Sequence, residues 1–161
     1  MKRLMKLMHE IGGIGMAGAL AAQLILVAVT PTEPITDYAA VRQAILAITQ
    51  WMLLPSLLLV LFCGLMAMAV HPPFHNARWV WAKALTGVGL LEGTLVTVQS
   101  TSRQLAEVST RAAAGQPDPQ RLAELLRTEW IGLWTILLLC LLNVVLGVMR
   151  PQLGAGGPAK A

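Results

Sequence analysis

Residues 45–70 read ILAITQWMLLPSLLLVLFCGLMAMAV and contain no charged side chain. A helix needs about 20 consecutive, mostly apolar residues to cross the hydrocarbon layer of a bilayer. The run is long enough for one crossing, and it lacks the apolar–polar alternation of barrel strands. It therefore predicts a membrane-spanning helix, because a helix satisfies its own backbone hydrogen bonds in lipid. Pro55 removes one of these bonds and should kink the helix at that point.

Three further stretches have the length of a span. Residues 11–30 and 130–149 are uncharged, whereas residues 79–98 include Lys83 and Glu92. The composition agrees with a membrane protein, because 56% of the residues are apolar and 12% are charged, against about 25% charged in soluble domains. These features also exclude a disordered chain. The predicted fold is an all-α bundle of four transmembrane helices that forms a single domain over residues 1–161.

The basic residues indicate the orientation, because short loops rich in Lys and Arg face the cytoplasm. They gather before the first span, between the second and third, and after the fourth: Lys2, Arg3, Lys6, Arg78, Lys83 and Arg150. Both termini are therefore predicted to be cytoplasmic, in a bacterial inner membrane, with a mobile tail at 151–161. The net charge of +4 fits this topology. It does not indicate nucleic-acid binding, because no basic stripe carries interleaved aromatic residues.

The segment between the third and fourth spans has the pattern of a helical hairpin. Gly115 is typical of a helix end, and Asp118 followed by Pro119 is typical of a new helix start. We expect helices three and four to continue beyond the bilayer as this hairpin, with apolar faces at Leu105, Val108 and Ala112 and at Leu122, Leu125, Leu126 and Trp130. Asp37 is expected to cap the helix that leads into the second span.

Glu92 is unusual because it lies within a predicted span. It follows Trp79 by 13 residues, which places it roughly 20 Å into the membrane. A carboxyl there should face the bundle interior and find a partner, and Gln23 lies at a similar depth on the first helix. Glu92 and Gln23 are either a proton- or substrate-binding pair or a structural hydrogen bond. Gly89 and Gly93 form a GxxxG pattern, which favours close packing within the bundle over homodimerisation.

Polar residues also gather near the predicted cytoplasmic boundary. His9, Lys83 and Asn143 have similar depths and could form one cluster, with His71 on the adjoining loop. The two possible ligands, His9 and His71, could bind haem, or they are interfacial histidines. Lys83 could hold an anionic group such as a propionate or a lipid phosphate, or could extend toward the headgroups. It lies on the helix face opposite Glu92.

No sequence motif of hydrolases, phosphate-binding loops, zinc sites or dinucleotide-binding folds is present. Cys63 and Cys140 fall inside spans, without the spacing of a metal or redox motif, and are expected to be buried thiols. We therefore predict neither a protein metal site nor catalysis of the soluble-enzyme type.

Three short motifs carry a family resemblance: Lys6-x-x-His9-x-x-Gly12, Arg78-Trp79 with Lys83, and Leu142-Asn143-Val144-Val145-Leu146 before Arg150-Pro151. The chain resembles bacterial integral membrane proteins known only as a domain of unknown function. These are similar in layout to CopD-type copper-resistance proteins and HemJ-type protoporphyrinogen oxidases. The resemblance to the HemJ type implies functional roles for His9 and Lys83. The absence of a carboxylate beside Asn143 argues against oxidase activity.

Three functions follow as hypotheses. The chain could bind haem b or a porphyrin near its cytoplasmic face through His9, Lys83 and His71. Alternatively, it could be a proton-linked carrier of a small substrate that uses Glu92 and Gln23. It could also be a non-catalytic anchor or assembly subunit, in a homo-oligomer or with a membrane partner.

Overall fold

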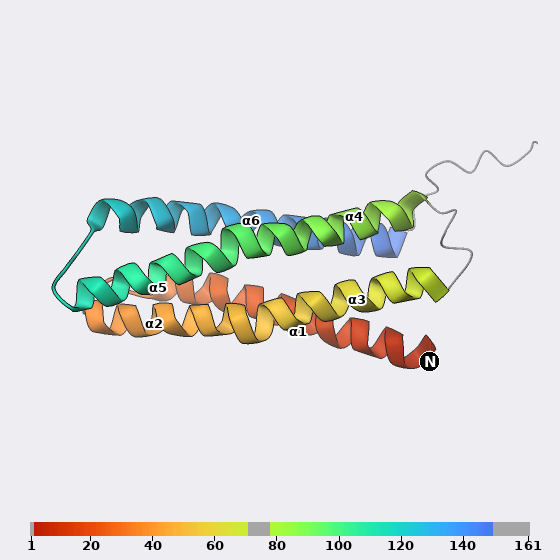
Figure 1. The fold of residues 1–161 in the computed structure, drawn as a ribbon, viewed down its shortest axis with the longest axis horizontal. Coiled ribbons are helices and arrows are strands. Elements are labelled where there is room, and N and C mark those ends of the chain that lie inside the picture. The colour runs from red at the N-terminus through yellow and green to blue at the C-terminus, as the bar shows by residue number, and fades with distance from the viewer. Residues whose placement is uncertain (1, 71–77, 150–161) are drawn as a thin grey trace, which may run out of the picture.

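The computed structural model describes residues 2–70 and 78–149, and every regular element in them is a helix. Short π-helical turns join several helices end to end, so the described residues form four long rods (Figure 1). The first is α1 (Lys2–Val29), and the second runs through α2 (Ile35–Ile48), η1 (Thr49–Leu53) and α3 (Leu54–Val70). The third runs through α4 (Arg78–Gly93), η3 (Thr94–Gln99) and α5 (Ser100–Ala113), and the fourth is α6 (Pro119–Met149).

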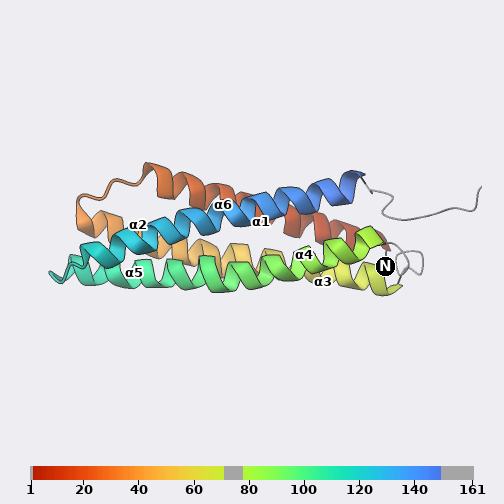
Figure 2. The same ribbon diagram turned by 90° about the horizontal axis from the view of Figure 1, so that it is seen from above.

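The four rods lie side by side along one long axis (Figures 1 and 2). The start of α1, the end of α3, the start of α4 and the end of α6 share one end of the bundle, and the α5–α6 turn lies at the other. Three of the rods contain helices long and apolar enough to cross a membrane: Arg3–Val29, Ile35–Val70 and Pro119–Val148. The all-α prediction is therefore confirmed. The predictions for His71 and for the tail at 151–161 fall on residues outside the described part of the chain.

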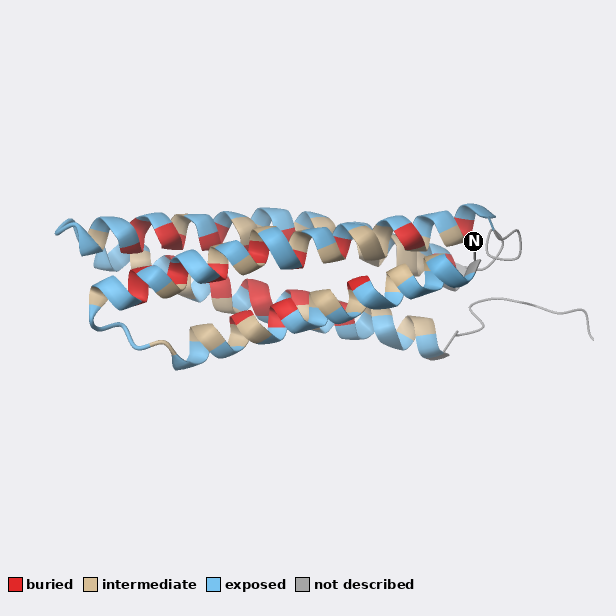
Figure 3. Ribbon diagram, turned by 90° about the horizontal axis from the view of Figure 1, so that it is seen from below, coloured by how far each residue is buried: buried red, intermediate tan, exposed pale blue. Residues whose placement is uncertain are grey.

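The buried residues form narrow stripes along the inner faces of the rods (Figure 3). One cluster fills the bundle around Leu20, Leu53, Leu90 and Leu133. A second cluster lies nearer the α5–α6 turn and consists of Leu105, Val108 and Leu125, with Leu122 and Leu126 packed against it. The apolar faces that the sequence predicted for the hairpin thus meet one another.

Large apolar side chains also cover much of the outer surface. We call this surface the apolar belt and define it by exposed residues on all four rods: Ile14, Ile25, Trp51, Leu58, Phe62, Leu85, Val88, Leu95, Val96, Ile131, Trp134, Leu138 and Val145. Monomeric soluble proteins rarely expose apolar patches larger than a few hundred Å². An apolar surface that surrounds a bundle is typical of a protein in lipid.

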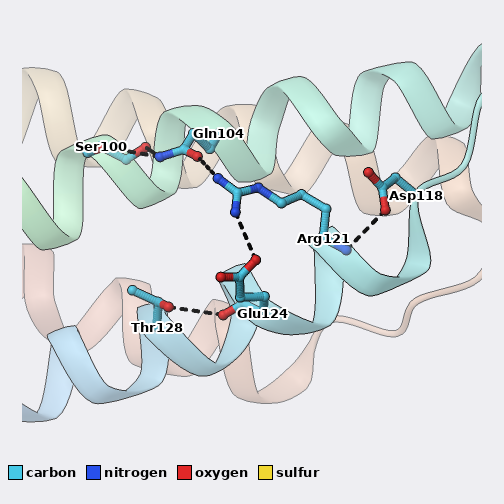
Figure 4. Close-up of polar contacts among 6 residues, drawn as sticks. All are labelled: Ser100, Gln104, Asp118, Arg121, Glu124 and Thr128. Carbon is cyan, nitrogen blue, oxygen red and sulfur yellow. Dashed lines mark hydrogen bonds and ion pairs between the residues drawn. The ribbon is translucent and has the colours of Figure 1, made fainter.

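The helical hairpin forms as its sequence predicts. Gly115 adopts a positive φ of 84° after α5, which is the conformation that favours glycine at a helix end. Asp118 accepts a hydrogen bond from the backbone N–H of Arg121 at 3.0 Å, and α6 begins at Pro119. The Arg121 guanidinium bonds Gln104 on α5 at 2.6 Å and Glu124 at 2.8 Å (Figure 4). The turn is therefore defined by the glycine at the end of α5, by the Asp118 cap of α6 and by the hydrogen bond between the two helices.

Two local expectations on the second rod are corrected. Asp37 does not cap α2: the helix begins at Ile35, the residue before it is Pro34, and no side chain caps that end. Asp37 instead lies in the first turn, where its charge complements the helix dipole. Pro55 was expected to kink the helix. The structure instead has the π-helical turn η1, which ends two residues before Pro55. A π turn shifts the hydrogen-bond register by one residue and so absorbs the missing N–H.

Candidate functional site

A cavity of about 70 Å³ lies at the end of the bundle that holds the start of α1. Its polar lining consists of His9 from α1, Lys83 from α4 and Asn143 from α6. Apolar side chains complete the wall, from α3 (Val60, Leu61, Leu65) and α4 (Val80, Ala84). The three polar residues predicted to cluster therefore do meet, although each comes from a different helix.

The imidazole of His9 is held by the backbone of α3. Its Nδ1 lies 3.0 Å from the carbonyl oxygen of Val60, and a carbonyl can only accept, so Nδ1 is the donor. This hydrogen bond fixes the tautomer and leaves the lone pair on Nε2. The side chain is half-buried beside Gly64. His9 thus offers an acceptor or ligand nitrogen at a fixed position in the wall.

Lys83 brings a cation into the cavity without an acidic partner. Among the described residues, no Asp or Glu lies within ion-pair distance of its ammonium group. The Nζ atom packs against Gly147 so closely that a Cβ at that position would lie 2.5 Å away. A larger residue at this position of α6 would make the end of the Lys83 side chain shift. The side chain is thus half-buried, and no described acidic side chain compensates its charge.

Asn143 connects α6 to α4 beside the cavity. Its Nδ2 donates to the backbone carbonyl of Lys83 at 3.2 Å and to Oγ1 of Thr86 at 2.8 Å. Thr86 in turn donates to the same carbonyl of Lys83 at 2.9 Å. These bonds tie α6 to α4 at the residue that carries the cation. Asn143 therefore positions Lys83, and its amide nitrogen is already used.

The cavity does not fit a porphyrin. Pockets for ligands of drug size measure about 300–1,000 Å³, whereas this cavity of about 70 Å³ holds roughly two waters at about 30 Å³ each. The lone pair of His9 would suit haem iron, but the cavity lined by the described residues is too small to enclose the macrocycle. Within residues 2–70 and 78–149, no group of three or more His, Cys, Asp or Glu side chains could hold a metal ion.

The predicted pairing of Glu92 with Gln23 is wrong. Gln23 is fully buried, as expected, but Glu92 is exposed on the outer face of α4. The inner face of this rod is formed by Lys83, Gly87, Leu90 and Thr94. Gly93 lies close to α6: a Cβ built on it would be 3.1 Å from Cδ1 of Ile136. The small residues that allow this packing turn Glu92 outward. Lys83 and Glu92 do lie on opposite faces, as predicted.

A polar layer lies where the two π-helical turns meet. Gln23, Thr49 and Thr94 are each fully buried, on α1, η1 and η3, and η1 contacts both of the other elements. Thr49 donates to the carbonyl of Ile45. The amide of Gln23 and the hydroxyl of Thr94 have no hydrogen-bond partner within the described part of the chain. The layer therefore lacks the carboxyl that a proton path through Gln23 was predicted to use.

The sequence analysis missed a buried ion pair. Arg42 on α2 donates to Glu129 on α6 at 2.6 Å, and the two side chains are 3% and 1% exposed. The Arg42 guanidinium also lies 4.9 Å from the ring centre of Tyr38. Tyr38, Arg42, Ile45 and Thr49 recur at helical spacing on one face. That periodicity is the sequence signal of a buried helix face that includes Arg42.

Comparisons with protein-family models, with curated proteins and with solved structures found no match for this chain. The resemblance to CopD-type and HemJ-type proteins therefore stays a prediction from short motifs. The function has to be argued from the geometry of the cavity and of the apolar belt.

Proposed function

We propose that this chain is a four-pass membrane protein that binds the anionic headgroup of an amphiphilic ligand in the cavity of His9, Lys83 and Asn143. The observation that carries the proposal is the half-buried ammonium of Lys83, which has no acidic partner among the described residues. Partial removal of an unpaired charge from water is costly, and a bound anion would offset that cost. A phosphate group is the natural candidate in a bilayer.

The apolar belt supports a fourth crossing by α4 and η3. Exposed apolar residues run from Trp81 to Val96 on this rod and from Ile131 to Val148 on α6. At a rise of about 1.5 Å per residue these stretches cover roughly 23 and 26 Å, close to the roughly 30 Å of a bilayer core. Residues 79–98 are less apolar than the other predicted spans because of their Thr and Gly residues and the charges of Lys83 and Glu92, but their outer face matches that of the other rods.

The charges support a cytoplasmic location for the cavity. Arg3 and Lys6 lie on the first turns of α1, at the same end of the bundle as Lys83. At the opposite end the arginines of α5 and α6 are accompanied by acidic residues, as in the pair of Arg121 with Glu124. The excess of basic residues at one end favours its placement in the cytoplasm, with the chain in a bacterial inner membrane.

The shape of the cavity favours a lipid over a haem. Its volume of about 70 Å³ suits at most the phosphate group of a lipid, and its apolar wall includes Leu65, which is also exposed on the outer surface. An acyl chain could therefore leave the cavity along the outside of α3 while the phosphate remains at Lys83. Nε2 of His9 would accept a hydrogen bond from a hydroxyl of the ligand, and Asn143 would hold the backbone of Lys83 in place.

Native mass spectrometry of the protein purified in mild detergent tests the proposal. Added phosphatidylglycerol should be retained at one molecule per chain, and Lys83→Gln should lower this retention at least tenfold. The matched control is Lys6→Gln, because Lys6 is also basic and near the same end but is exposed and paired with Glu10 at 3.7 Å. It should change retention less than twofold.

Three further binding measurements distinguish the possible ligands. Inorganic phosphate should bind far more weakly than the lipid, because it lacks the apolar contacts, and phosphatidylethanolamine should be retained less than phosphatidylglycerol. Added haem should give no Soret band above that of a His9→Ala variant. Retention by Lys83→Gln equal to that of the wild type would overturn the proposal, as would a haem band that depends on His9.

A further inference from the structure

A second cavity lies beside the turn between α5 and α6, at the end of the bundle opposite the cavity of Lys83. Its volume is about 500 Å³, within the roughly 300–1,000 Å³ of pockets that bind small ligands. Val108, a member of the second apolar cluster, forms part of its wall. The other lining side chains are polar: Gln104, Glu107, Arg111, Gln116, Asp118 and Arg121. We call this the hairpin cavity.

One wall of the hairpin cavity is held in place by hydrogen bonds (Figure 4). The guanidinium of Arg121 donates to Gln104 and to Glu124. The backbone N–H of Arg121 donates to Asp118, and Gln104 donates to the hydroxyl of Ser100 at 3.2 Å. The charge of Arg121 is therefore already compensated, and this wall gives the cavity a defined shape.

Two opposite charges in the same cavity have no such partners. Within the described residues, neither Glu107 nor Arg111 makes an ion pair or a side-chain hydrogen bond. They lie four residues apart on α5, in the order that favours pairing on a helix, and the same spacing joins Lys6 to Glu10 at 3.7 Å. Both side chains instead line the cavity and are exposed to solvent. They present an acceptor and a donor, one helical turn apart, to a ligand that enters from solvent.

We propose that the hairpin cavity binds a free α-amino acid. The ammonium group of the ligand would donate to Glu107, and its carboxylate would accept two hydrogen bonds from the planar guanidinium of Arg111. The side chain of the ligand would lie toward Val108, and Gln116 would bond a polar group on it. This inference goes beyond lipid binding at Lys83 and does not rest on it, because the two cavities lie at opposite ends of the bundle.

The charges favour a ligand that carries both signs. A simple carboxylate would be attracted by Arg111 but repelled by Glu107, and a simple amine would meet the opposite pair of forces. An α-amino acid has its two charged groups on one carbon atom. It can therefore bridge two side chains whose Cβ atoms are about 5–6 Å apart on a helix.

Binding of amino acids to the full chain in mild detergent tests the proposal. The common amino acids are added one at a time at millimolar concentration. At least one should raise the thermal midpoint, because a ligand that binds the folded state stabilises it. Equilibrium dialysis with that amino acid should then show one molecule bound per chain.

Two analogues of that amino acid test the requirement for both charges. One lacks the α-amino group and the other lacks the carboxylate, and each should bind at least tenfold more weakly than the amino acid. The absence of any stabilising amino acid would overturn the proposal, as would an analogue that binds as tightly as the amino acid.

Neutral variants locate the site. Glu107→Gln and Arg111→Gln should each lower the affinity at least tenfold, because each removes one of the two charges. The matched control is Arg103→Gln, since Arg103 is an exposed arginine of the same helix that does not line the cavity. It should change the affinity less than twofold.

An unchanged affinity in Glu107→Gln or Arg111→Gln would overturn the proposal, as would an equal loss in Arg103→Gln. All three native side chains are exposed, so the variants should unfold at the wild-type midpoint without ligand. Lipid retention at Lys83 should be unchanged in all three, so this test and that of the proposed function fail independently.

Discussion

Arg42 and Glu129 show how strongly a fold can depend on two charges that it hides from water. Their contact at 2.6 Å leaves both side chains almost without exposure. Removing charges from water is expensive, and only a close, well-bonded partner offsets that cost. The pair therefore specifies how α2 sits against α6 more than it adds net stability.

Truncation of either partner should be strongly destabilising. Arg42→Ala and Glu129→Ala should each lower the free energy of unfolding by about 3–5 kcal/mol, because each leaves one uncompensated buried charge. Thermal unfolding in detergent, followed by circular dichroism, measures this loss. Arg121→Ala is the control, since its pair with Glu124 is exposed, and it should cost about 1 kcal/mol or less.

The double variant Arg42→Met with Glu129→Leu separates a buried charge from lost packing. It should recover most of the stability, because apolar pairs of similar volume commonly replace buried ion pairs at little cost. A double variant as unstable as the two single variants together would contradict this explanation.

At the residue scale, the sequence predicted the depth of a side chain along the bundle better than the helix face on which it lies. Lys83 and Asn143 were placed at one depth and do meet, since depth follows from counting residues along helices. Glu92 and Gln23 were also placed at one depth, but their pairing depended on the rotation of α4 about its axis. The packing of Gly93 against Ile136 sets that rotation, and no local sequence signal reports it. The Arg42–Glu129 contact is likewise a product of tertiary structure.

At the element scale, helix ends followed from local chemistry. Gly115, Asp118 and Pro119 stop and start helices through their own backbone and side-chain preferences, so the turn was predictable. The π-helical turn before Pro55 was foreseen only as a disturbance. The second one, at η3, contains no proline, and Thr97 donates to the carbonyl of Gly93 there. Its position beside η1 shows that it belongs to the packing of two rods.

Two adjacent glycines of α1 offer a test of helix packing. A Cβ on Gly12 would lie 2.9 Å from Cγ2 of Val60 and 3.0 Å from the backbone oxygen of Ser56, whereas a Cβ on Gly13 would meet nothing within 4 Å. Gly12→Ala should therefore destabilise the bundle by about 1–3 kcal/mol through overpacking. Gly13→Ala should leave stability unchanged or raise it by up to about 1 kcal/mol, because alanine is the better helix former.

The measurement is the unfolding midpoint of both variants in the same detergent. Lipid retention at the cavity should also fall in Gly12→Ala, because α1 carries His9 and would be pushed away from α3. If the two variants unfold alike, the close approach of α1 to α3 is not a feature of the folded protein.

At the scale of the whole molecule, the bundle is longer than a bilayer is thick. The second rod has 36 residues, or about 54 Å at the usual helical rise, against a hydrocarbon core of roughly 30 Å. The apolar belt covers the half that holds the cavity, and the charged residues of α5 and the start of α6 cover the other half. The α5–α6 hairpin and α2 should therefore project from the membrane on the side opposite the cavity.

Labelling of single cysteines in intact cells tests this arrangement. Glu33→Cys and Gln116→Cys lie in the two turns at the projecting end, and both native side chains are exposed. A membrane-impermeant maleimide should label both variants from outside the inner membrane, because the proposed topology places the basic end of the bundle in the cytoplasm. Arg3→Cys lies at the opposite end and should react only after the membrane is opened, while Lys2 and Lys6 preserve the orientation signal. Labelling of Arg3→Cys together with Gln116→Cys in intact cells would contradict four crossings, since three spans would then separate the N-terminus from the hairpin and leave them on opposite sides.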